Sequence, residues 1–411
     1  MDRKKNMPQI RYQNYEDNWD VEKLINIFGT IRNAFVGTAT PYYVENGNFY
    51  LESNNVKNGK INYNSQIFIN DEFYEKQRDK WLKTNDIVMV QSGHVGHTAV
   101  IPEELNNTAA HALIVFTDYK KEVNPHFLNY QFQSNGKRKE LDLISTGNTI
   151  KHILASEMKN FKMDFPTSEE QSAIGSLFRT LDNLLASYKD NLANYQSLKA
   201  TMLSKMFPKA GQTVPEIRLD GFDGEWNLIK LGDFCDLITK GTTGKSQSEQ
   251  GKINFVKVEN LKDNEIYPVV KISEEEHFGS LKRSILYEGD VLFSIAGTLG
   301  RTAIVRNNIL PANTNQALAI IRGYKLDAYF LLVVLSGEVV KDYIRKNPTV
   351  GAQPNLSLEQ VSSLKIKIPS LEEQQAIGTY FSNLDNLINS HQEKITQLET
   401  LKKKLLQDMF I

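Results

Sequence analysis

The stretch EEQSAIGSLFRTLDNL at residues 169–184 returns as EEQQAIGTYFSNLDNL at residues 372–387. When residues 166–207 are laid over residues 369–410 without a gap, 18 of 42 positions are identical. An ungapped repeat of this length indicates that one structural unit occurs twice in the chain, so the repeat has to be interpreted before any single element.

The similarity continues upstream of both stretches with small gaps. PQIRYQNYEDNW matches PEIRLDGFDGEW, YLESNNVKNGKI matches FVKVENLKDNEI, and NDIVMVQSGHVGHTAV matches GDVLFSIAGTLGRTAI. We therefore predict a tandem duplication with four segments: a first globular domain at 1–165, a central helix at 166–210, a second globular domain at 211–368 and a C-terminal helix at 369–411.

Both globular segments are predicted to mix strands and helices. Short apolar runs such as DIVMV, ALIVF and DVLFSI are bounded by Gly, Asn or Asp, which is typical of buried strands. PHFLNYQFQS and DAYFLLVVLSGEVVKDYIR have the length and spacing of helices. The expected fold class is α+β, with a sheet at the centre of each domain.

The repeated stretch itself is predicted to be a long helix in both copies. Thr167 and Ser370 each precede a glutamate by three residues, the spacing of a capping box. Apolar residues then recur at steps of three and four, which predicts a coiled-coil seam of about five heptads. The first seam comprises Ile174, Leu177, Leu181, Leu184, Tyr188, Tyr195, Leu198 and Met202, and the second comprises Ile377, Tyr380, Leu384, Leu387, His391, Leu398, Leu401 and Leu405.

The connection at 208–215 is short, so we expect the two seams to pair as an antiparallel coiled coil with pseudo-two-fold symmetry. Asn191 and Lys394 place a polar side chain at the same heptad position of each seam. A polar group there either fixes register and partner or marks a stutter in which Leu192 and Ile395 take over the contact.

Composition limits the classes of protein that the chain can belong to. Its 411 residues are 40% hydrophobic, enough for several buried cores, and the single cysteine, Cys235, is expected to be a core residue. The N-terminus lacks an apolar signal-peptide core and no run reaches the ~18 apolar residues of a membrane span, so we expect a soluble, cytoplasmic protein.

The charge of the chain does not by itself indicate that the protein binds nucleic acid. The net charge is −1, with 20 basic against 20 acidic side chains in residues 1–165 and 19 against 19 in residues 211–369. Proteins that hold DNA alone usually carry a basic excess, so a partner would have to supply much of the phosphate binding. Two domains on a rod suit a ligand with approximate two-fold symmetry, of which duplex DNA is the commonest, or equally two protein partners on a scaffold.

The segments VPEIRLDGFDGEWNLIKLGDF, GDVLFSIAGTLGRTAIV and IPSLEEQQAIGTYFSNLDNLI resemble the specificity subunit of type I restriction–modification systems. The resemblance covers essentially the whole chain in the family's order of recognition domain, helix, recognition domain, helix. The first copy departs from the pattern with Asn85 in place of glycine and with His94 and His97 between and after its glycines.

The resemblance implies a subunit without catalysis or cofactors of its own. Each target recognition domain would read one half of a bipartite, asymmetric DNA sequence, and the helices would set the spacer and dock two methyltransferase subunits. Those subunits would bind S-adenosylmethionine and methylate adenine, while restriction and translocase subunits would use ATP and Mg. The alternative is a coiled-coil adaptor that binds only protein partners.

Motifs for catalysis do not stand out. NPHF at 124–127 is one proline short of an amino-methyltransferase motif and is better explained by a proline at a helix start. TKGTTGKS at 239–246 lacks the first glycine of a phosphate-binding loop and no amphipathic helix follows it, so we expect a basic loop that faces DNA or a plain solvated loop. The seven histidines lack the spacing of metal ligands.

Candidate DNA-binding residues are chosen by side-chain type and loop position, because base edges and phosphates are contacted by basic and amide or hydroxyl side chains. Gly93, Gly96, Gly297 and Gly300 are expected to shape tight turns rather than to contact DNA. In the first domain the candidates are Arg32, Gln91, His94, Asn135, Lys137, Arg138, Asn148 and Lys151. In the second they are Lys240, Thr242, Thr243, Lys245, Arg301, Arg345, Lys346 and Gln353.

Four apolar residues of the long helices lie off the predicted seam: Phe178, Leu185, Phe381 and Ile388. If they are exposed in the isolated chain, they form the docking surface for a methyltransferase partner. The alternative is that they pack beneath the globular domains.

Overall fold

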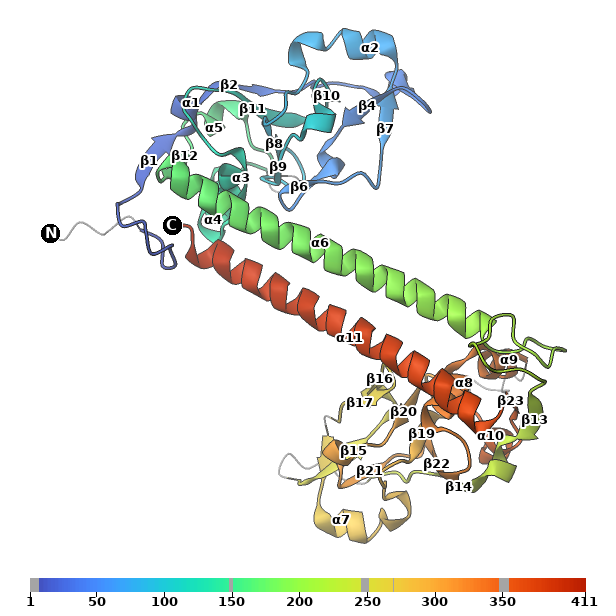
Figure 1. Cartoon of the computed structure of the whole chain (residues 1–411). Coiled ribbons are helices and arrows are strands. Elements are labelled where there is room, and N and C mark those ends of the chain that lie inside the picture. The colour runs from blue at the N-terminus through green and yellow to red at the C-terminus, as the bar shows by residue number, and fades with distance from the viewer. Residues whose placement is uncertain (1–6, 148–150, 245–250, 269, 347–354) are drawn as a thin grey trace. The chain divides into compact units, whose positions relative to one another are not determined.

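The computed structural model describes residues 7–147, 151–244, 251–268, 270–346 and 355–411 (Figure 1). The chain divides into two compact units: unit 1 comprises residues 1–188 with 394–411, and unit 2 comprises residues 189–393. The division falls inside the two long helices, α6 (Ser168–Lys205) and α11 (Leu371–Asp408), so each unit holds one globular domain and part of both helices.

Unit 1 is built on an antiparallel sheet of order β2-β11-β8-β9, joined by a second sheet of order β10-β4-β7-β3 and by the pair β1-β12. Its strands are β1 (Asp20–Lys23), β2 (Phe28–Asn33), β3 (Tyr43–Val44), β4 (Asn48–Leu51), β5 (Val56–Lys57), β6 (Lys60–Ile61), β7 (Ile67–Ile69), β8 (Ile87–Val90), β9 (Thr98–Val100), β10 (Ala109–Ala110), β11 (Leu113–Tyr119) and β12 (Lys162–Phe165). Its shorter helices are α1 (Leu24–Ile27), α2 (Asp71–Glu75), α3 (Pro125–Gln133), α4 (Asn135–Ile144) and α5 (Ala155–Met158).

Unit 2 has a corresponding first sheet, β14-β22-β19-β20, and the pair β13-β23, while its second sheet, β18-β15-β21, has one strand fewer among the described residues. Its strands are β13 (Asn227–Lys230), β14 (Cys235–Lys240), β15 (Ile253–Val256), β16 (Leu261–Lys262), β17 (Glu265–Ile266), β18 (Val270–Ile272), β19 (Val291–Ser294), β20 (Thr302–Ile304), β21 (Ala312–Thr314), β22 (Leu318–Tyr324) and β23 (Lys365–Ile368). Its shorter helices are α7 (Glu274–Phe278), α8 (Ala328–Ser336), α9 (Glu338–Lys346) and α10 (Leu358–Ser362). The predicted duplication and the α+β class are therefore confirmed.

The central strand β8 shows why its sequence is apolar without alternation. Ile87 and Met89 belong to the core cluster that includes α3 and α6, whereas Val88 and Val90 belong to a second cluster on the opposite face. Successive side chains of a strand point to opposite faces, so a strand covered on both sides needs an uninterrupted apolar run.

The long helices form where the repeat predicts them, and the predicted seam is buried in part, at Ile174, Leu181, Ile377 and Leu384. Phe178 and Phe381 are 0% exposed and Leu185 is also buried, whereas Leu184 and Leu387 are each 43% exposed. Of the two alternatives for these residues, burial holds for Phe178, Leu185 and Phe381, so they do not form an exposed docking surface, and Ile388 is half-buried. The physical reason is that each helix packs with this face against the globular domain of its own unit.

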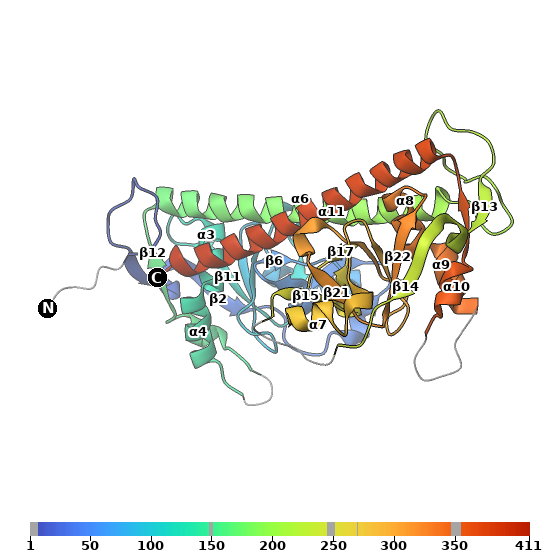
Figure 2. The same cartoon turned by 90° about the horizontal axis from the view of Figure 1, so that it is seen from below.

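In unit 1 the motif EEQxxIG fastens the start of α6 to its own domain, and α3 lies against this half of α6 (Figures 1 and 2). Arg11 donates two hydrogen bonds of 2.7 Å to the Glu170 carboxylate. The Gln171 side chain accepts from the Asn124 backbone N–H at 3.1 Å at the start of α3. Gly175 permits this close approach, because a Cβ there would lie 2.7 Å from Asn124 Oδ1.

Unit 2 repeats the same three contacts. Arg218 donates to both carboxylate oxygens of Glu373 at 2.8 and 2.7 Å, and the Asp327 backbone N–H donates to Gln374 at 3.1 Å. A Cβ at Gly378 would lie 2.3 Å from Asp327 Oδ1. The repeated motif therefore docks each long helix on the globular domain of its own unit.

Within each unit the two long helices run antiparallel. In unit 1 the ring centroids of Phe178 and Phe410 are 5.7 Å apart, and Lys402 Nζ lies 2.7 Å from Asp182 Oδ1. In unit 2, Tyr195 contacts His391 at 5.1 Å between ring centroids. Residue numbers rise on one helix as they fall on the other, which confirms the predicted antiparallel contact.

The polar interruptions of the seam are resolved by their neighbours. Asn191 and Lys394 are exposed, Ile395 is buried and Leu192 is half-buried. Of the two alternatives left by the sequence, the stutter describes these helices.

Candidate nucleic-acid interface

A glycine-containing turn follows the central strand of each unit. In unit 1 it joins β8 to β9, and Gly93 and Gly96 have φ angles of 81° and 78°. In unit 2 the turn joins β19 to β20, with φ angles of 75° and 82° at Gly297 and Gly300. These left-handed conformations favour glycine, so the predicted structural role of the four glycines is confirmed.

The segment that follows α4 returns to this turn in unit 1. The Gly93 N–H donates to the Lys151 carbonyl at 3.1 Å, and the Ile153 N–H donates to the Gln91 carbonyl at 2.9 Å. Unit 2 has the corresponding contact, in which the Leu356 N–H donates to the Ile295 carbonyl at 2.8 Å. Each unit therefore gathers a turn and a returning loop at one end of its sheet.

His97 connects the turn of unit 1 to α4 and to the hairpin β5-β6. Its Nδ1 accepts hydrogen bonds from the Arg138 guanidinium and from the Asn58 backbone N–H, both at 3.2 Å. Burial, followed by the charges of Arg138, His94 and Lys57, lowers the pKa of His97 to about 4. The ring is therefore neutral at pH 7, with its proton on Nε2, and it orients Arg138 without adding charge.

Arg301 occupies the position of His97 in unit 2. Its backbone N–H donates to Ser294 Oγ at 2.7 Å, and its Nη1 lies 3.2 and 3.3 Å from the Val258 and Leu261 carbonyls. The side chain remains exposed and charged. The same position of the turn thus carries a neutral imidazole in one unit and a cation in the other.

The structure brings several predicted residues together. In unit 1, Gln91, His94, Arg138 and Lys151 lie on the turn, on α4 or on the returning loop, and Lys151 also pairs with Asp142 at 2.9 Å. In unit 2, Lys240 lies across β22 from Phe293, at the end of the sheet where the turn begins.

The remaining candidates are more scattered. Asn135 is exposed at the start of α4, while Thr242 and Thr243 follow β14, with the Thr242 N–H bonded to the Thr314 carbonyl at 3.1 Å. Arg345 and Lys346 are exposed at the end of α9, where Arg345 pairs with Glu338 and Asp342. Asn148, Lys245 and Gln353 lie outside the described residues.

Two candidates are held by groups of their own domain. Lys137 is 4% exposed and its ammonium lies 3.0 Å from the buried Asp164 carboxylate. Arg32 is half-buried on β2 and donates to the Lys80 carbonyl at 3.1 Å. Both side chains stabilise the domain, because a buried cation needs such partners.

Sequence reasoning missed two residues of this end of unit 1: His97, which accepts from Arg138, and Lys57, whose charge acts on His97. The signal for Lys57 is the pair Asn58-Gly59, with φ angles of 51° and 81°, which is the favoured sequence for a two-residue β-hairpin turn. Predicting the β5-β6 hairpin would not, however, have shown that it lies against the β8-β9 turn.

Other motifs are settled by local geometry. Asn124 caps α3 by accepting from the Phe127 N–H at 3.1 Å and Pro125 is the first helical residue, so NPHF is a helix start as predicted. Within the part of the chain that the structure describes, His, Cys, Asp and Glu side chains do not gather in groups of three that could hold a metal ion. Over the same residues, the helices lack the combined length and apolar character that crossing a membrane requires.

Two α+β units on similar scaffolds, each with a turn and a returning loop of different residues, define a duplicated two-domain protein. The family described as "Type I restriction modification DNA specificity domain" matches residues 16–194 and 223–400. The chain belongs to this family and carries one family domain in each half of its sequence.

Curated relatives agree with this assignment. The chain is similar to the type I restriction enzyme MjaVIII specificity subunit of Methanocaldococcus jannaschii, with 24% identity over 63% of this chain and 64% of that relative. The chain therefore spans just under two thirds of that relative's length. It is also 22% identical to the putative MjaX specificity subunit of the same organism, over 95% of this chain and 92% of the relative.

Solved structures share the fold. The S subunit of a type I restriction–modification system from M. genitalium matches with a TM-score of 0.65 and 16% identity, covering 98% of this chain and 99% of that chain. A chain from a structural study of complex assembly and conformational transition in the type I R-M system matches with a TM-score of 0.51 and 18% identity, covering 94% and 96%. These likenesses show a shared fold, and the family match favours a DNA-specificity protein over the protein-only adaptor.

Proposed function

We propose that the chain is the DNA-recognition subunit of a type I restriction–modification complex and that each unit reads one half of a bipartite target. The observation that carries this proposal is the repetition of one scaffold with different side chains at the same places. Arg138 corresponds to Lys341, Asp142 to Arg345 and His97 to Arg301. Two similar scaffolds that carry different side chains can read two different half-sites. The full target sequence would therefore be asymmetric.

The first unit has the clearest phosphate-binding cluster. Lys57 and Arg138 act electrostatically on His97, and Lys151 is bonded through its carbonyl to the same turn. Cations gathered on loops are the usual contacts to phosphates, which position a protein on DNA. Because the whole chain has a net charge of −1, we expect tight binding only in a complex whose other subunits add positive charge.

Partner subunits are proposed to dock on leucines that the two long helices leave exposed. Leu184 and Leu198 on α6 are 43% and 38% exposed, and Leu387 and Leu401 on α11 are 43% and 44% exposed. Leu184 and Leu387 occupy equivalent positions of the repeat, and so do Leu198 and Leu401. The same partner surface can therefore contact either helix. We propose that these are two methyltransferase subunits, which bind S-adenosylmethionine, and that restriction subunits add ATP and Mg chemistry.

The recognition role is tested by sequencing modified bases in host DNA with the gene intact and with it deleted. We expect methylated adenine at one split motif in the first case and its loss in the second. An unchanged pattern in cells that express the protein would contradict the proposal.

The contacts are tested in the assembled complex with DNA that carries the identified motif. Lys57→Ala combined with Arg138→Ala should weaken binding to all sequences and reduce its salt dependence by about two phosphate contacts. Lys83→Ala is the matched control, since Lys83 pairs with Asp118 at 2.9 Å and precedes β8, at the other end of this strand from the turn. Equal losses of DNA affinity in both variants would show that Lys57 and Arg138 do not contact the DNA backbone.

Docking is tested by copurification. Leu184→Glu combined with Leu387→Glu should reduce recovery of the methyltransferase subunits at least tenfold, because a buried carboxylate in an apolar contact is strongly unfavourable. The control is Asp190→Ala with Glu393→Ala, which changes exposed positions of the same helices. Undiminished recovery with the leucine variant would place the docking surface elsewhere.

A further inference from the structure

Three lysines recur at equivalent places in the two units, and we call each set of three a lysine triad. All six side chains are exposed. The members are Lys23 and Lys230 at the ends of β1 and β13, Lys162 and Lys365 at the starts of β12 and β23, and Lys120 and Lys325 directly after β11 and β22. The duplication has thus kept one basic surface in two units whose turn-and-loop residues differ.

In unit 1, contacts between three chain segments bring the triad together. Lys23 and Lys162 lie directly opposite each other in the antiparallel pair β1-β12. Lys120 Nζ donates to the Ile25 carbonyl at 2.9 Å, two positions after Lys23. The three lysines therefore share one end of the domain.

Unit 2 repeats this arrangement. Lys230 and Lys365 lie directly opposite each other in β13-β23. The Lys325 N–H donates to the Phe234 carbonyl at 2.8 Å, and the Lys120 N–H makes the equivalent contact in unit 1, also at 2.8 Å. The same three chain segments therefore meet in both units.

Two lysines that face each other across a strand pair repel. Opposite residues of an antiparallel pair point to the same face with about 5 Å between their Cβ atoms, and like charges there are destabilising. Within the part of the chain that the structure describes, none of the six ammonium groups lies within ion-pair distance of a carboxylate. Lys23 and Lys120 donate instead to uncharged oxygens, those of Asn160 and Ile25. An acidic group from outside the chain would remove this repulsion.

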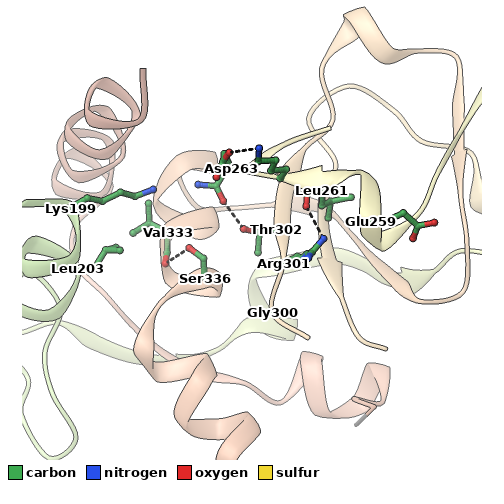
Figure 3. Close-up of a pocket in the computed structure, with 12 residues that line it drawn as sticks. Lys199, Leu203, Glu259, Leu261, Asp263, Gly300, Arg301, Thr302, Val333 and Ser336 are labelled. Atoms are coloured by element: carbon green, nitrogen blue, oxygen red, sulfur yellow. Dashed lines mark hydrogen bonds and ion pairs between the residues drawn. The ribbon is translucent and has the colours of Figure 1, made fainter. Parts of the chain in front are cut away.

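A pocket elsewhere in unit 2 shows how cations are satisfied within the chain. It lies between α6, α8, the β16-β17 hairpin and the β19-β20 turn, and its volume is about 580 Å³ (Figure 3). Lys199 pairs with Asp385, and Lys262 Nζ lies 4.0 Å from Asp263 Oδ2. Arg301 donates to two backbone carbonyls. The cations of this pocket are thus paired internally, whereas, among the described residues, those of the triads are not.

An exposed apolar residue adjoins each triad. Val21 and Leu228 are 52% and 60% exposed, and each lies two positions before a triad lysine on the same strand, hence on the same face. In unit 2 a pocket of about 320 Å³ opens here, lined in part by Leu228, Lys230 and Lys365, with Asp233 also in its wall. Each unit therefore offers an apolar contact beside a cluster of positive charge.

The triads lie at the end of each sheet that is opposite to the glycine-containing turn. Strand β11 begins opposite Val90, where the turn starts, and ends at Tyr119, the residue before Lys120. At about 3.3 Å per residue this strand spans roughly 20 Å. In unit 2, β22 likewise begins opposite Ser294 and ends directly before Lys325. This end of the domain suits a protein partner better than the DNA that we place at the turn.

We propose that each lysine triad, with the apolar residue beside it, binds an acidic segment of a methyltransferase subunit. Carboxylates of the segment approach the facing lysines, and an apolar side chain of the segment covers Val21 or Leu228. The inference rests on the proposed function, which supplies one partner protein in two copies, and it explains why the basic surface is duplicated. Occupation by DNA phosphates is the competing outcome, and the test separates the two.

The test counts the methyltransferase subunits bound to the full-length chain by native mass spectrometry. Lys23→Glu combined with Lys162→Glu should leave one copy in place of two, with at least a tenfold loss of the doubly loaded complex. Lys230→Glu combined with Lys365→Glu should remove the other copy, and all four substitutions together should remove both. The reason is that each reversal turns attraction of the acidic segment into repulsion.

The matched control reverses two lysines that the duplication does not repeat. Lys252 and Lys271 are exposed in unit 2 but correspond to Gly47 and Phe68 in unit 1. Lys252→Glu combined with Lys271→Glu changes the net charge by the same amount as each triad variant. This control should leave both methyltransferase copies bound.

Single substitutions separate assembly from folding. Lys162→Glu places a carboxylate opposite Lys23, so the melting temperature of the isolated chain should rise by roughly 1–3 °C while methyltransferase binding weakens. Lys365→Glu, opposite Lys230, should act likewise in unit 2. A merely structural role would move both quantities in the same direction. If a double variant does not fold, these single variants carry the test.

Three outcomes overturn the inference. If the wild-type chain binds two methyltransferase subunits and both triad variants also bind two, the triads are not the docking surface, while the proposed function stands. If the variants keep both subunits but the complex binds DNA at least tenfold more weakly, the triads contact DNA phosphates instead. If the wild-type chain itself binds no methyltransferase subunit, the proposed function fails together with this inference.

Discussion

Arg11 and Glu170 are 159 positions apart in sequence, and their side chains form a bidentate pair with two contacts of 2.7 Å. The Glu170 side chain is fully buried and that of Arg11 is 10% exposed. Breaking a buried pair leaves an uncompensated charge, which costs about 3–5 kcal/mol. We therefore expect Arg11→Ala to lower the free energy of unfolding by about that amount, measured by urea denaturation.

The control for this prediction is Arg78→Ala. Arg78 pairs with Glu75, but the two side chains are 69% and 48% exposed, and exposed pairs contribute about 0–1 kcal/mol. Equal effects of the two substitutions would show that the Arg11 contact does not fasten the helix.

Gly175→Ala tests the close approach of α6 and α3. Alanine favours helix by about 1 kcal/mol over glycine, yet its Cβ would lie 2.7 Å from Asn124 Oδ1, which caps α3. We expect a net destabilisation of about 1–3 kcal/mol. Ser172→Ala, at an exposed position of the same helix, should change stability by less than about 0.5 kcal/mol. A stabilised Gly175→Ala variant would mean that α3 moves aside freely.

Phe410→Ala tests the contribution of the chain's end to unit 1. Phe410 is buried, and its ring contacts those of Trp19, Phe127 and Phe178. Removing a buried phenylalanine side chain costs about 3–5 kcal/mol, so the melting temperature of unit 1 should fall while that of unit 2 is kept. Amide hydrogen exchange, read separately on β8 and β19, distinguishes the two units. Equal loss of protection in both strands would show that they unfold together.

Acid should destabilise unit 1 through His97 and His126. Burial lowers the pKa of both side chains to about 4. Their ordinary pKa is 6.5, so between pH 4 and pH 6.5 the unfolded chain binds more protons than the folded chain. Stability therefore rises with pH across this window and is fully present above it. Urea denaturation at pH 5 and pH 7 should show the difference.

The matched variants are His97→Gln, which keeps an acceptor for Arg138, and His126→Tyr, which introduces the residue that unit 2 carries as Tyr329. The double variant should lose much of the difference in stability between pH 5 and pH 7. An unaltered pH dependence would assign the acid sensitivity to carboxyl groups instead.

The duplication, the helices and the strand-rich domains could be predicted from the sequence, because repeats and periodicity are local properties of the chain. Which face of each long helix is buried could not be predicted from the sequence. Phe178 lies off the predicted seam but is buried like the seam residue Leu181, because the ring of Tyr130 in the globular domain and that of Phe410 both contact it. Spacing alone therefore included Leu184 and Leu387 in the seam, although both are exposed.

Site residues were predictable by type but not by environment. Lys137 and Arg138 are neighbours in sequence, yet one ammonium is held by Asp164 inside the domain while the other side chain faces His97. Asp164 lies on β12 and His97 beside a turn, and the sequence does not show which strand or turn each basic side chain meets.

The membership of α11 in both units has a consequence for synthesis on the ribosome. Unit 2 is continuous, whereas unit 1 needs Met409 and Phe410 in its core. The recognition domain that is translated first must therefore wait for the final residues of the chain, roughly 10 to 40 s later at ordinary rates of elongation. A translation product that stops before Met409 would carry a first domain with an open core, a substrate for proteases, so only chains that include Met409 and Phe410 would persist.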